Sequence, residues 1–139
     1  MPVIIVRPFN SFGPRSDHEG DAGEVIPKFV LRALAGQQLT IFGDGEQTRD
    51  FCYLSDTARG IVLAATADEA LGETINLGSG SVLSIRDLAQ AVFAAVADDS
   101  ASLRFDAVRP GDLHRLCAAT DKARRLLGFS PTVSFSEGP

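Results

Sequence analysis

The sequence has no long apolar run and no recognisable leader. No stretch approaches the ~20 consecutive apolar residues that a helix needs to span a bilayer. At the start, Met1-Pro2 leads directly into the apolar stretch 3–6, without the basic region or the small-residue cleavage site of a secretory signal. We therefore expect a cytoplasmic protein without a membrane segment.

Cysteine and histidine are scarce. The two cysteines, Cys52 and Cys117, lie far apart in the sequence and match no metal-binding or redox spacing. The two histidines, His18 and His114, also lack the spacing of a ligand pair and stand among polar residues. We interpret the cysteines as small buried side chains in a reducing compartment and the histidines as surface residues, and we expect no metal site.

Two glycine-containing segments lack the context of a dinucleotide-binding turn, which follows a strand and opens a helix. Residues 43–45 (Gly-Asp-Gly) lie between two predicted strands and favour a hairpin turn. Residues 78–80 (Gly-Ser-Gly) follow a strand, but the next helix begins only near Ser84, so a structural turn competes with an anion-binding role. The only tyrosine, Tyr53, has Thr57 rather than lysine four residues further on, and no self-sufficient catalytic set is visible.

The size and charge of the chain narrow its class. At 139 residues, with 45% hydrophobic and 22% charged residues, it is long enough for one domain with a real core. The net charge of −5 argues against general attraction to nucleic acid or to an anionic membrane. A local anion site is not excluded, because several arginines stand beside predicted turns.

Periodicity and turn residues predict a mixed α/β protein with short strands and three or four helices. Strands are predicted at residues 3–6, 39–42, 48–54, 74–77 and 103–108. Helices are predicted at residues 24–35, from Ser55 with the apolar stripe Ala58, Ile61, Val62 and Ala65, from Ser84 in a capping box with Asp87, and from Thr120 to a stop at Gly128.

The first predicted strand, residues 3–6, is a continuous β-branched run. Such a run is typical of a parallel strand that is covered on both faces. A strand of that kind needs neighbours on both edges, usually through crossover helices, and few other segments fit that role. We therefore expect the chain to be part of a larger protein.

Polar side chains stand at the ends of the predicted strands. Arg7 and Asn10 follow the first strand, Arg49 lies at the start of another, and Arg109 and Asp112 follow a third. Ligands of open α/β sheets usually bind beyond the carboxyl ends of the strands. Arginine suits phosphate and aspartate suits a ribose diol, so convergence of these residues would fit a nucleoside diphosphate. Surface charges or local ion pairs remain the alternative, because spacing does not establish convergence.

A series of short motifs resembles one family. In order, they are 7–10 (Arg-Pro-Phe-Asn), 13–15 (Gly-Pro-Arg), 25–27 (Val-Ile-Pro), 39–45 (Leu-Thr-Ile-Phe-Gly-Asp-Gly), 47–51 (Gln-Thr-Arg-Asp-Phe), 76–80 (Asn-Leu-Gly-Ser-Gly), 109–112 (Arg-Pro-Gly-Asp) and 122–129 (Lys-Ala to Leu-Leu-Gly-Phe). This series is similar to the C-terminal, substrate-binding half of the NAD-dependent epimerase/dehydratase family, extended short-chain dehydrogenases/reductases that include UDP-glucose 4-epimerases, dTDP-glucose 4,6-dehydratases and UDP-glucuronate decarboxylases. The resemblance covers nearly the whole chain. It implies part of a Rossmann-type parallel sheet and a small mixed α/β substrate-binding lobe.

The resemblance implies roles for four polar residues. Asn10 would hydrogen-bond the nucleotide sugar near its diphosphate. Arg49 and Arg109 would hold the diphosphate, and Asp112 would hold the ribose. These implied roles agree with the chemistry of the side chains themselves.

The resemblance also implies roles for five apolar residues. Val25 and Ile26 would line the nucleobase pocket, and Ile41 and Phe42 would help to hold the base, partly through backbone groups. Phe9 would lie near the nicotinamide side of the cleft in a complete enzyme. The base itself, uracil or thymine, stays open.

The family's catalytic parts have no counterpart in this sequence. The resemblance implies that the glycine-rich NAD turn, the Tyr-x-x-x-Lys pair and the accompanying Ser or Thr precede the first of these motifs. We therefore expect residues 1–139 to form a single substrate-binding portion of an enzyme that uses NAD, without binding NAD or catalysing a reaction alone. The expected partners are a nucleotide sugar and either the missing NAD-binding half or a second copy of the chain. A free-standing nucleotide-sugar binding module and a non-catalytic interaction protein are the alternatives.

Overall fold

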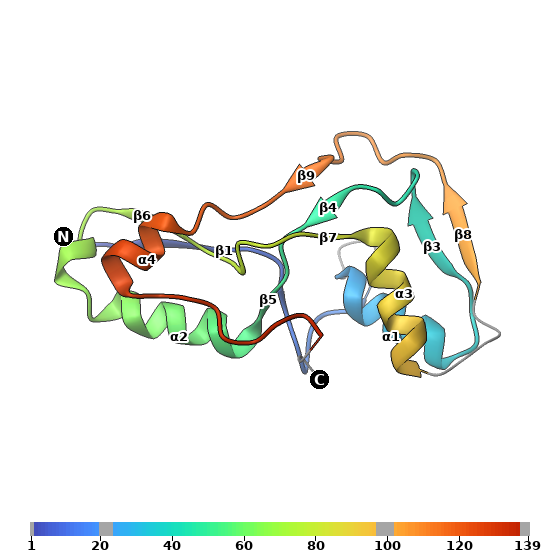
Figure 1. The fold of residues 1–139 in the computed structure, drawn as a ribbon, viewed down its shortest axis with the longest axis horizontal. Coiled ribbons are helices and arrows are strands. Elements are labelled where there is room, and N and C mark those ends of the chain that lie inside the picture. Colours follow the sequence, from blue (N-terminus) through green and yellow to red (C-terminus); the bar gives the residue numbers. More distant parts are fainter. Residues whose placement is uncertain (1, 20–23, 97–101, 137–139) are drawn as a thin grey trace. The chain divides into compact units, whose positions relative to one another are not determined.

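The computed structural model describes residues 2–19, 24–96 and 102–136, and the chain divides into two compact units (Figure 1). The first unit consists of Met1–Gly13, Arg49–Val82 and Leu116–Pro139. The second unit consists of Pro14–Thr48 and Leu83–Arg115.

The first unit is built on two parallel strand pairs. Strand β1 (Ile5–Pro8) pairs with β6 (Thr74–Leu77) from Ile5 opposite Thr74 to Pro8 opposite Leu77. The other elements of this unit are β2 (Ser11–Phe12), which pairs with β5 (Cys52–Tyr53), α2 (Leu54–Ala65), the 3-10 helix η1 (Asp68–Ala70) and α4 (Asp121–Leu127).

The core of the first unit lies between these helices and the β1–β6 pair. Ile75 and Leu77 of β6 are fully buried together with Phe129, just after α4. Ile4, just before β1, and Val6 of β1 pack against this cluster. Burial of each side chain of this size contributes about 1.5–3 kcal/mol to folding.

The second unit packs two helices over a parallel strand pair. Helix α1 (Val25–Leu34) packs against α3 (Ile85–Val96), and both contact β3 (Leu39–Phe42). Strand β3 pairs with β8 (Leu103–Asp106) along its whole length. The buried side chains of this unit are Phe29, Ala33, Leu39, Ile41, Ile85, Leu88, Ala89 and Val92.

A three-stranded sheet has the order β7–β4–β9. Boundaries between the two units along the sequence fall within β4 and β9 and directly before β7. These strands are β4 (Thr48–Arg49), β7 (Leu83–Ser84) and β9 (Arg115–Leu116). Among the described helices, none is long and apolar enough to cross a membrane.

Several predicted elements are confirmed. The strands at 39–42 and 74–77 are β3 and β6, and the helix predicted at 24–35 is α1. Asp87 donates its backbone N–H to Ser84 Oγ at 2.9 Å, as the capping box predicts. The mixed α/β class is confirmed as well.

The predicted strand 48–54 is wrong in its extent. It divides into β4 and β5, and Leu54 already belongs to α2, which begins without a side-chain cap from Ser55. The interruption falls at Asp50, whose backbone N–H donates to Leu116 O at 2.9 Å while its side chain turns into the protein.

The predicted hairpin at 43–45 is also wrong, although the turn exists and both glycines have positive φ. Strand β3 pairs with β8, whereas β4 pairs with β7 and β9. The chain after the turn is held instead at the start of α3, because Arg86 donates its backbone N–H to Gly45 O at 3.0 Å and Ile85 donates to Gln47 O at 3.1 Å.

Helix α2 buries the face opposite to the predicted apolar stripe. Ile61 and Val62 of that stripe are 44% and 65% exposed. The side of α2 that carries Gly60 is buried instead, and a Cβ atom built on Gly60 would lie 2.8 Å from Leu77 and 3.1 Å from Phe129. The missing side chain lets the helix approach the core closely, and hydrophobic periodicity does not detect such an approach.

The first strand is not covered on both faces among the described residues. Ile5 is 52% exposed and Val3 is 41% exposed. The strand pairs on one edge only, with β6. The described residues therefore do not supply the second cover that the sequence predicts for this strand, and that cover stays a prediction.

Candidate functional site

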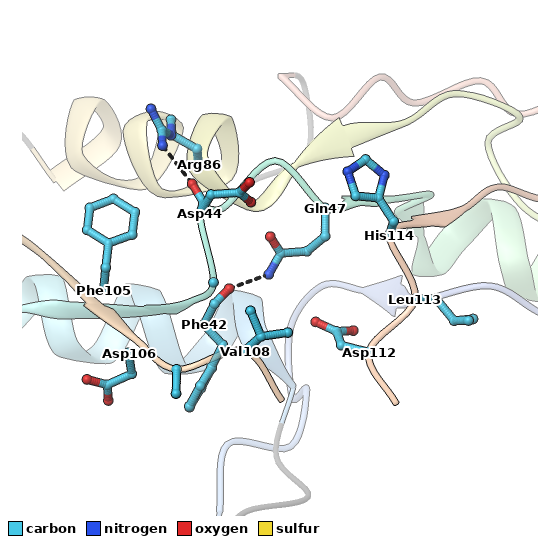
Figure 2. Close-up of a pocket in the computed structure, with 12 residues that line it drawn as sticks. Phe42, Asp44, Gln47, Arg86, Phe105, Asp106, Val108, Asp112, Leu113 and His114 are labelled. Carbon is cyan, nitrogen blue, oxygen red and sulfur yellow. Dashed lines mark hydrogen bonds between the residues drawn. The ribbon is translucent and has the colours of Figure 1, made fainter. Parts of the chain in front are cut away.

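The second unit contains a pocket of about 730 Å³ at the ends of β3 and β8 (Figure 2). Its wall is completed by the turn after β3, the first turn of α3 and the loop that follows β8. The lining residues are Phe42, Gly43, Asp44, Gln47, Arg86, Phe105, Asp106, Ala107, Val108, Asp112, Leu113 and His114.

An aromatic ring with a guanidinium group over it marks one side of the pocket. The guanidinium carbon of Arg109 lies 3.8 Å from the centre of the Phe42 ring. This distance is well within the range of a cation–π contact, which holds the long arginine side chain over the ring. Val108 lies beside Phe42, so this side of the pocket joins a flat apolar surface to a fixed positive charge.

Hydrogen bonds fix the turn that follows β3. The side-chain Nε2 of Gln47 donates to Phe42 O at 2.7 Å, and Arg86 donates to Asp44 O at 2.6 Å (Figure 2). The carbonyl of Phe42 can only accept, so the nitrogen of the Gln47 amide must face it. Arg86 also lies 3.3 Å from the Glu46 carboxylate, which orients its guanidinium group at the edge of the pocket.

In the first unit, Asn10 is held in an unusual backbone conformation after β1. Its φ angle is 26°, in the region that residues with a Cβ atom rarely adopt. Its side-chain Nδ2 donates to Asp50 O at 2.7 Å, and its carbonyl accepts the N–H of Cys52 at 3.3 Å. These two hydrogen bonds fix both the backbone and the amide of Asn10.

The side chain of Asp50 is fully buried and accepts four hydrogen bonds. Ser79 donates its N–H and its hydroxyl to Oδ1 at 2.8 and 2.6 Å. Gly80 and Ala118 donate their N–H groups to Oδ2, each at 3.0 Å. The turn at 78–80 therefore binds an internal carboxylate, which favours the structural alternative over an external anion.

Comparison with known proteins gives the family. The sequence model of the "NAD dependent epimerase/dehydratase family" matches residues 1–78. The chain belongs to this family. The expected resemblance and the fold class are thereby confirmed.

Two curated relatives show the extent of the similarity. The chain is 36% identical to a UDP-N-acetyl-alpha-D-glucosaminuronate decarboxylase of Bacillus cytotoxicus, over 99% of this chain and 44% of that protein. It is 38% identical to a UDP-glucose 4-epimerase of Mycolicibacterium smegmatis, over 96% of this chain and 42% of that protein. The chain spans less than half the length of these curated relatives.

Solved structures of the family have the same fold over this length. An epimerase of Methanothermobacter thermautotrophicus matches with a TM-score of 0.93 and 39% identity, over 99% of this chain and 41% of that one. A UDP-glucuronic acid 4-epimerase of Bacillus cereus, solved with UDP-glucuronic acid and NAD, matches with a TM-score of 0.89 and 37% identity, over 99% and 43%.

The structure brings three of the predicted site residues together in the second unit. Phe42 and Asp112 line the pocket, and Arg109 lies on the Phe42 ring. Ile41 is fully buried in β3, behind the pocket rather than in its wall. The other two predicted residues of this unit, Val25 and Ile26, are half-buried in the first turn of α1 and do not line the pocket.

The remaining three predicted site residues, Asn10, Phe9 and Arg49, lie in the first unit. Asn10 is exposed, and Phe9 is half-buried and donates its N–H to Leu77 O at 2.8 Å. Arg49 is half-buried in β4. Their roles in ligand binding stay predictions.

Sequence reasoning missed Gln47 and Asp50. Gln47 belongs to the motif at residues 47–51, but only the folded chain shows that its side chain donates a hydrogen bond to the Phe42 carbonyl. For Asp50 a signal existed, because in the predicted strand it shares a face with the apolar residues Cys52 and Leu54. A carboxylate on an apolar face requires internal donors when it is buried.

A second buried carboxylate, Asp56, holds the chain near its C-terminus. Thr132 donates its N–H at 2.8 Å and its hydroxyl at 2.9 Å, Val133 donates its N–H at 2.9 Å, and Arg59 donates from its guanidinium at 2.8 Å. Burial alone raises the pKa of Asp56, but these hydrogen bonds outweigh it and leave the pKa below its usual value.

The cysteines and histidines have the surroundings that the sequence predicts, with one exception. Cys52 is buried, and burial is the main cause that raises the pKa of its thiol, so it is not activated as a nucleophile. Cys117 is only half-buried. Both histidines are exposed, and His114 borders the pocket. Within residues 2–19, 24–96 and 102–136, no group of three His, Cys, Asp or Glu side chains is placed to hold a metal ion.

Proposed function

We propose that this chain is the nucleotide-sugar-binding portion of an NAD-dependent nucleotide-sugar epimerase/dehydratase, similar to UDP-glucose 4-epimerases, and that it does not catalyse a reaction alone. The observation that carries the proposal is the pocket that Phe42 and Asp112 line, together with the contact of Arg109 with the Phe42 ring. The ligand class is supported by the relatives, two of which were solved with UDP-glucose and with UDP-glucuronic acid.

The pocket offers one group for each part of a nucleoside diphosphate. Val108 and Phe42, whose ring Arg109 covers on one face, give the pocket an apolar wall. Such a wall suits a nucleobase, because burial of apolar surface away from water is favourable. Arg109 would hold the diphosphate through its planar guanidinium group. Asp112, exposed at the pocket wall, would accept hydrogen bonds from the ribose hydroxyls.

The family resemblance assigns further residues to the same ligand. Asn10 and Arg49 would contact the sugar and the diphosphate, and Val25 and Ile26 would lie near the base. Ile41, buried behind the pocket, would act by supporting the backbone beside Phe42. These assignments stay proposals that the variants below can test.

The described residues do not fit an NAD site of their own. In the first glycine segment, Ser79 and Gly80 donate their N–H groups to Asp50. The second glycine segment, the turn at 43–45, leads to β4 rather than to a helix. The ring of Tyr53 packs against Phe12, with ring centres 5.4 Å apart. We therefore propose that NAD, the cofactor named by the family, is held by a part of the enzyme that residues 1–139 do not supply.

An exposed apolar face supports a partner that carries this cofactor. Ile61 and Val62 of α2 are solvent-exposed, and so are Val3 and Ile5 of the first strand, although all four are large hydrophobic residues. Contiguous exposed apolar surface marks interaction sites on soluble proteins. Since the relatives are more than twice as long as the matched region, we propose that the NAD-binding part of the enzyme covers this face.

Calorimetric titration tests the ligand. We expect UDP-glucose or dTDP-glucose to bind this chain and NAD to produce no heat of binding. Arg109→Ala and Arg49→Ala should each abolish binding, whereas Arg124→Ala, a change at an exposed arginine of α4, should leave it within twofold. A folded chain that binds neither nucleotide sugar would refute the proposal in favour of a non-catalytic interaction protein. A reading frame that encodes the glycine-rich NAD turn and the Tyr-x-x-x-Lys pair ahead of this chain would decide for the enzyme portion over the free-standing module.

A further inference from the structure

The Asp50 carboxylate is directed entirely into the protein. Its side chain is 0% exposed, and its two oxygens accept four hydrogen bonds from residues 79, 80 and 118. A Cβ atom on Gly78 would lie 2.8 Å from Oδ2, so the surrounding backbone is packed tightly around the carboxylate. With its charge and its acceptor positions used in this way, Asp50 has no direct role toward a ligand.

The backbone of Asp50 is nevertheless joined to a predicted ligand contact. Its N–H donates to Leu116 O at 2.9 Å, and its carbonyl accepts Nδ2 of Asn10 at 2.7 Å. Asn10 has a φ of 26°, a conformation that persists only where the surroundings determine it strongly. The Asp50 peptide supplies one of those constraints, and the side chain of Asp50 anchors that peptide.

We propose that Asp50 is a positioning residue that sets the amide of Asn10. The buried carboxylate fixes the peptide at residue 50, and the carbonyl of that peptide turns Nδ2 of Asn10 toward the protein. The Asn10 carboxamide oxygen and the second amide hydrogen are then held in one orientation toward a bound sugar or diphosphate. The proposal rests on the proposed function for its ligand, but not for the anchoring of Asn10.

The test compares two buried carboxylates of the same unit. Asp50→Asn places an amide nitrogen where only hydrogen-bond donors surround the side chain. Asp56→Asn makes the same change at the other buried carboxylate, which accepts hydrogen bonds from residues 132 and 133 and has no hydrogen bond to Asn10. The first readout is the side-chain amide NMR signal of Asn10 in the ligand-free chain. We expect Asp50→Asn to move this signal toward the value of a free amide and Asp56→Asn to leave it in place.

The second readout is affinity for UDP-glucose. We expect a loss of about tenfold in Asp50→Asn, as for one displaced hydrogen-bonding group, and less than twofold in Asp56→Asn. Asn10→Ala combined with Asp50→Asn should lose no more affinity than Asn10→Ala alone, because both changes remove the same contact. Additive losses in this double variant would overturn the proposal.

The outcomes distinguish this proposal from the proposed function. An unmoved Asn10 signal in Asp50→Asn, or equal movement in both variants, overturns the positioning role. If the unchanged chain binds no UDP-glucose, the proposed ligand fails, while the NMR comparison still decides the anchoring. Should Asp50→Asn not fold, Ser79→Ala removes the hydroxyl that donates to Asp50 Oδ1 at 2.6 Å, together with its hydrogen bonds to Ser81. This variant should shift the same signal in the same direction by a smaller amount.

Discussion

Replacing Asp56 by asparagine changes one oxygen into an NH2 group at a site where four donors converge on the carboxylate. With its nitrogen at the Oδ2 position, the new amide leaves the N–H groups of Thr132 and Val133 without an acceptor. With its nitrogen at the Oδ1 position, it displaces the Arg59 donor, while the Thr132 hydroxyl can turn to accept. Each unsatisfied buried donor costs about 1–3 kcal/mol. The Arg59 side chain is 39% exposed, so solvent screens its charge interaction with Asp56. The loss of this ion pair therefore adds no further cost to the expected destabilisation. We expect a destabilisation of about 2 kcal/mol, which is the lower cost for two unsatisfied donors.

The assay is urea unfolding at neutral pH, with thermal unfolding as a second measure. A loss of about 2 kcal/mol corresponds to a fall in Tm of roughly 5–8 °C for a chain of this size. Asp68→Asn, a change at an exposed acid of η1, serves as the control and should leave Tm unchanged. A loss below about 1 kcal/mol for Asp56→Asn would refute the reasoning, because it would mean that the four hydrogen bonds contribute no more than a surface contact.

The same residue predicts a pH dependence whose sign follows from its lowered pKa. The carboxylate stabilises the folded chain above the pKa that Asp56 has when unfolded, and this stability is lost as the pH falls through the lower folded pKa. The unchanged chain should therefore lose stability below about pH 4 more steeply than Asp56→Asn, and the two curves should converge in acid. Parallel curves between pH 6 and pH 2 would contradict the assignment.

Three further changes test other parts of the structure. Gly78→Ala would bring a Cβ atom to 2.4 Å from the Ala118 Cβ and 2.8 Å from Asp50 Oδ2, and it should destabilise the chain by about 2 kcal/mol or more in urea unfolding. Val62→Ser on the exposed face of α2 should cost less than about 0.5 kcal/mol and should reduce binding of an apolar fluorescent dye; unchanged dye binding would count against an exposed apolar face. Phe135→Ala removes a half-buried ring whose centre lies 5.2 Å from that of Phe12, and it should cost about 1–3 kcal/mol, measured by the same unfolding assay against Asp68→Asn.

Some residues of the candidate site can be predicted from the sequence motifs, and the roles of others appear only in the folded structure. Phe42, Arg109 and Asp112 are predicted from the motifs. In the structure Phe42 and Asp112 line one pocket, and Arg109 contacts the Phe42 ring. The roles of Gln47 and Asp50 emerge only from their hydrogen bonds to backbone atoms. A side chain that supports another residue's backbone has no fixed spacing from it, so no local pattern identifies it.

The sequence by itself determined the local elements, since hydrophobic periodicity, caps and glycine stops act within a few residues. Helix α1, strands β3 and β6 and the Ser84 cap are all of this kind. The ordered motifs likewise determined the family. Each of these features depends on neighbours along the chain.

The tertiary structure decided which segments pair and which helix face is buried. The parallel pairing of β3 with β8 replaces a predicted hairpin, because strand partners distant in sequence compete with the nearest one. Helix α2 turns its Gly60 side toward Leu77 and Phe129, because a residue without a side chain allows this close approach, and Ile61 and Val62 remain exposed. Both outcomes depend on contacts between residues far apart in the chain, and no local pattern contains those contacts.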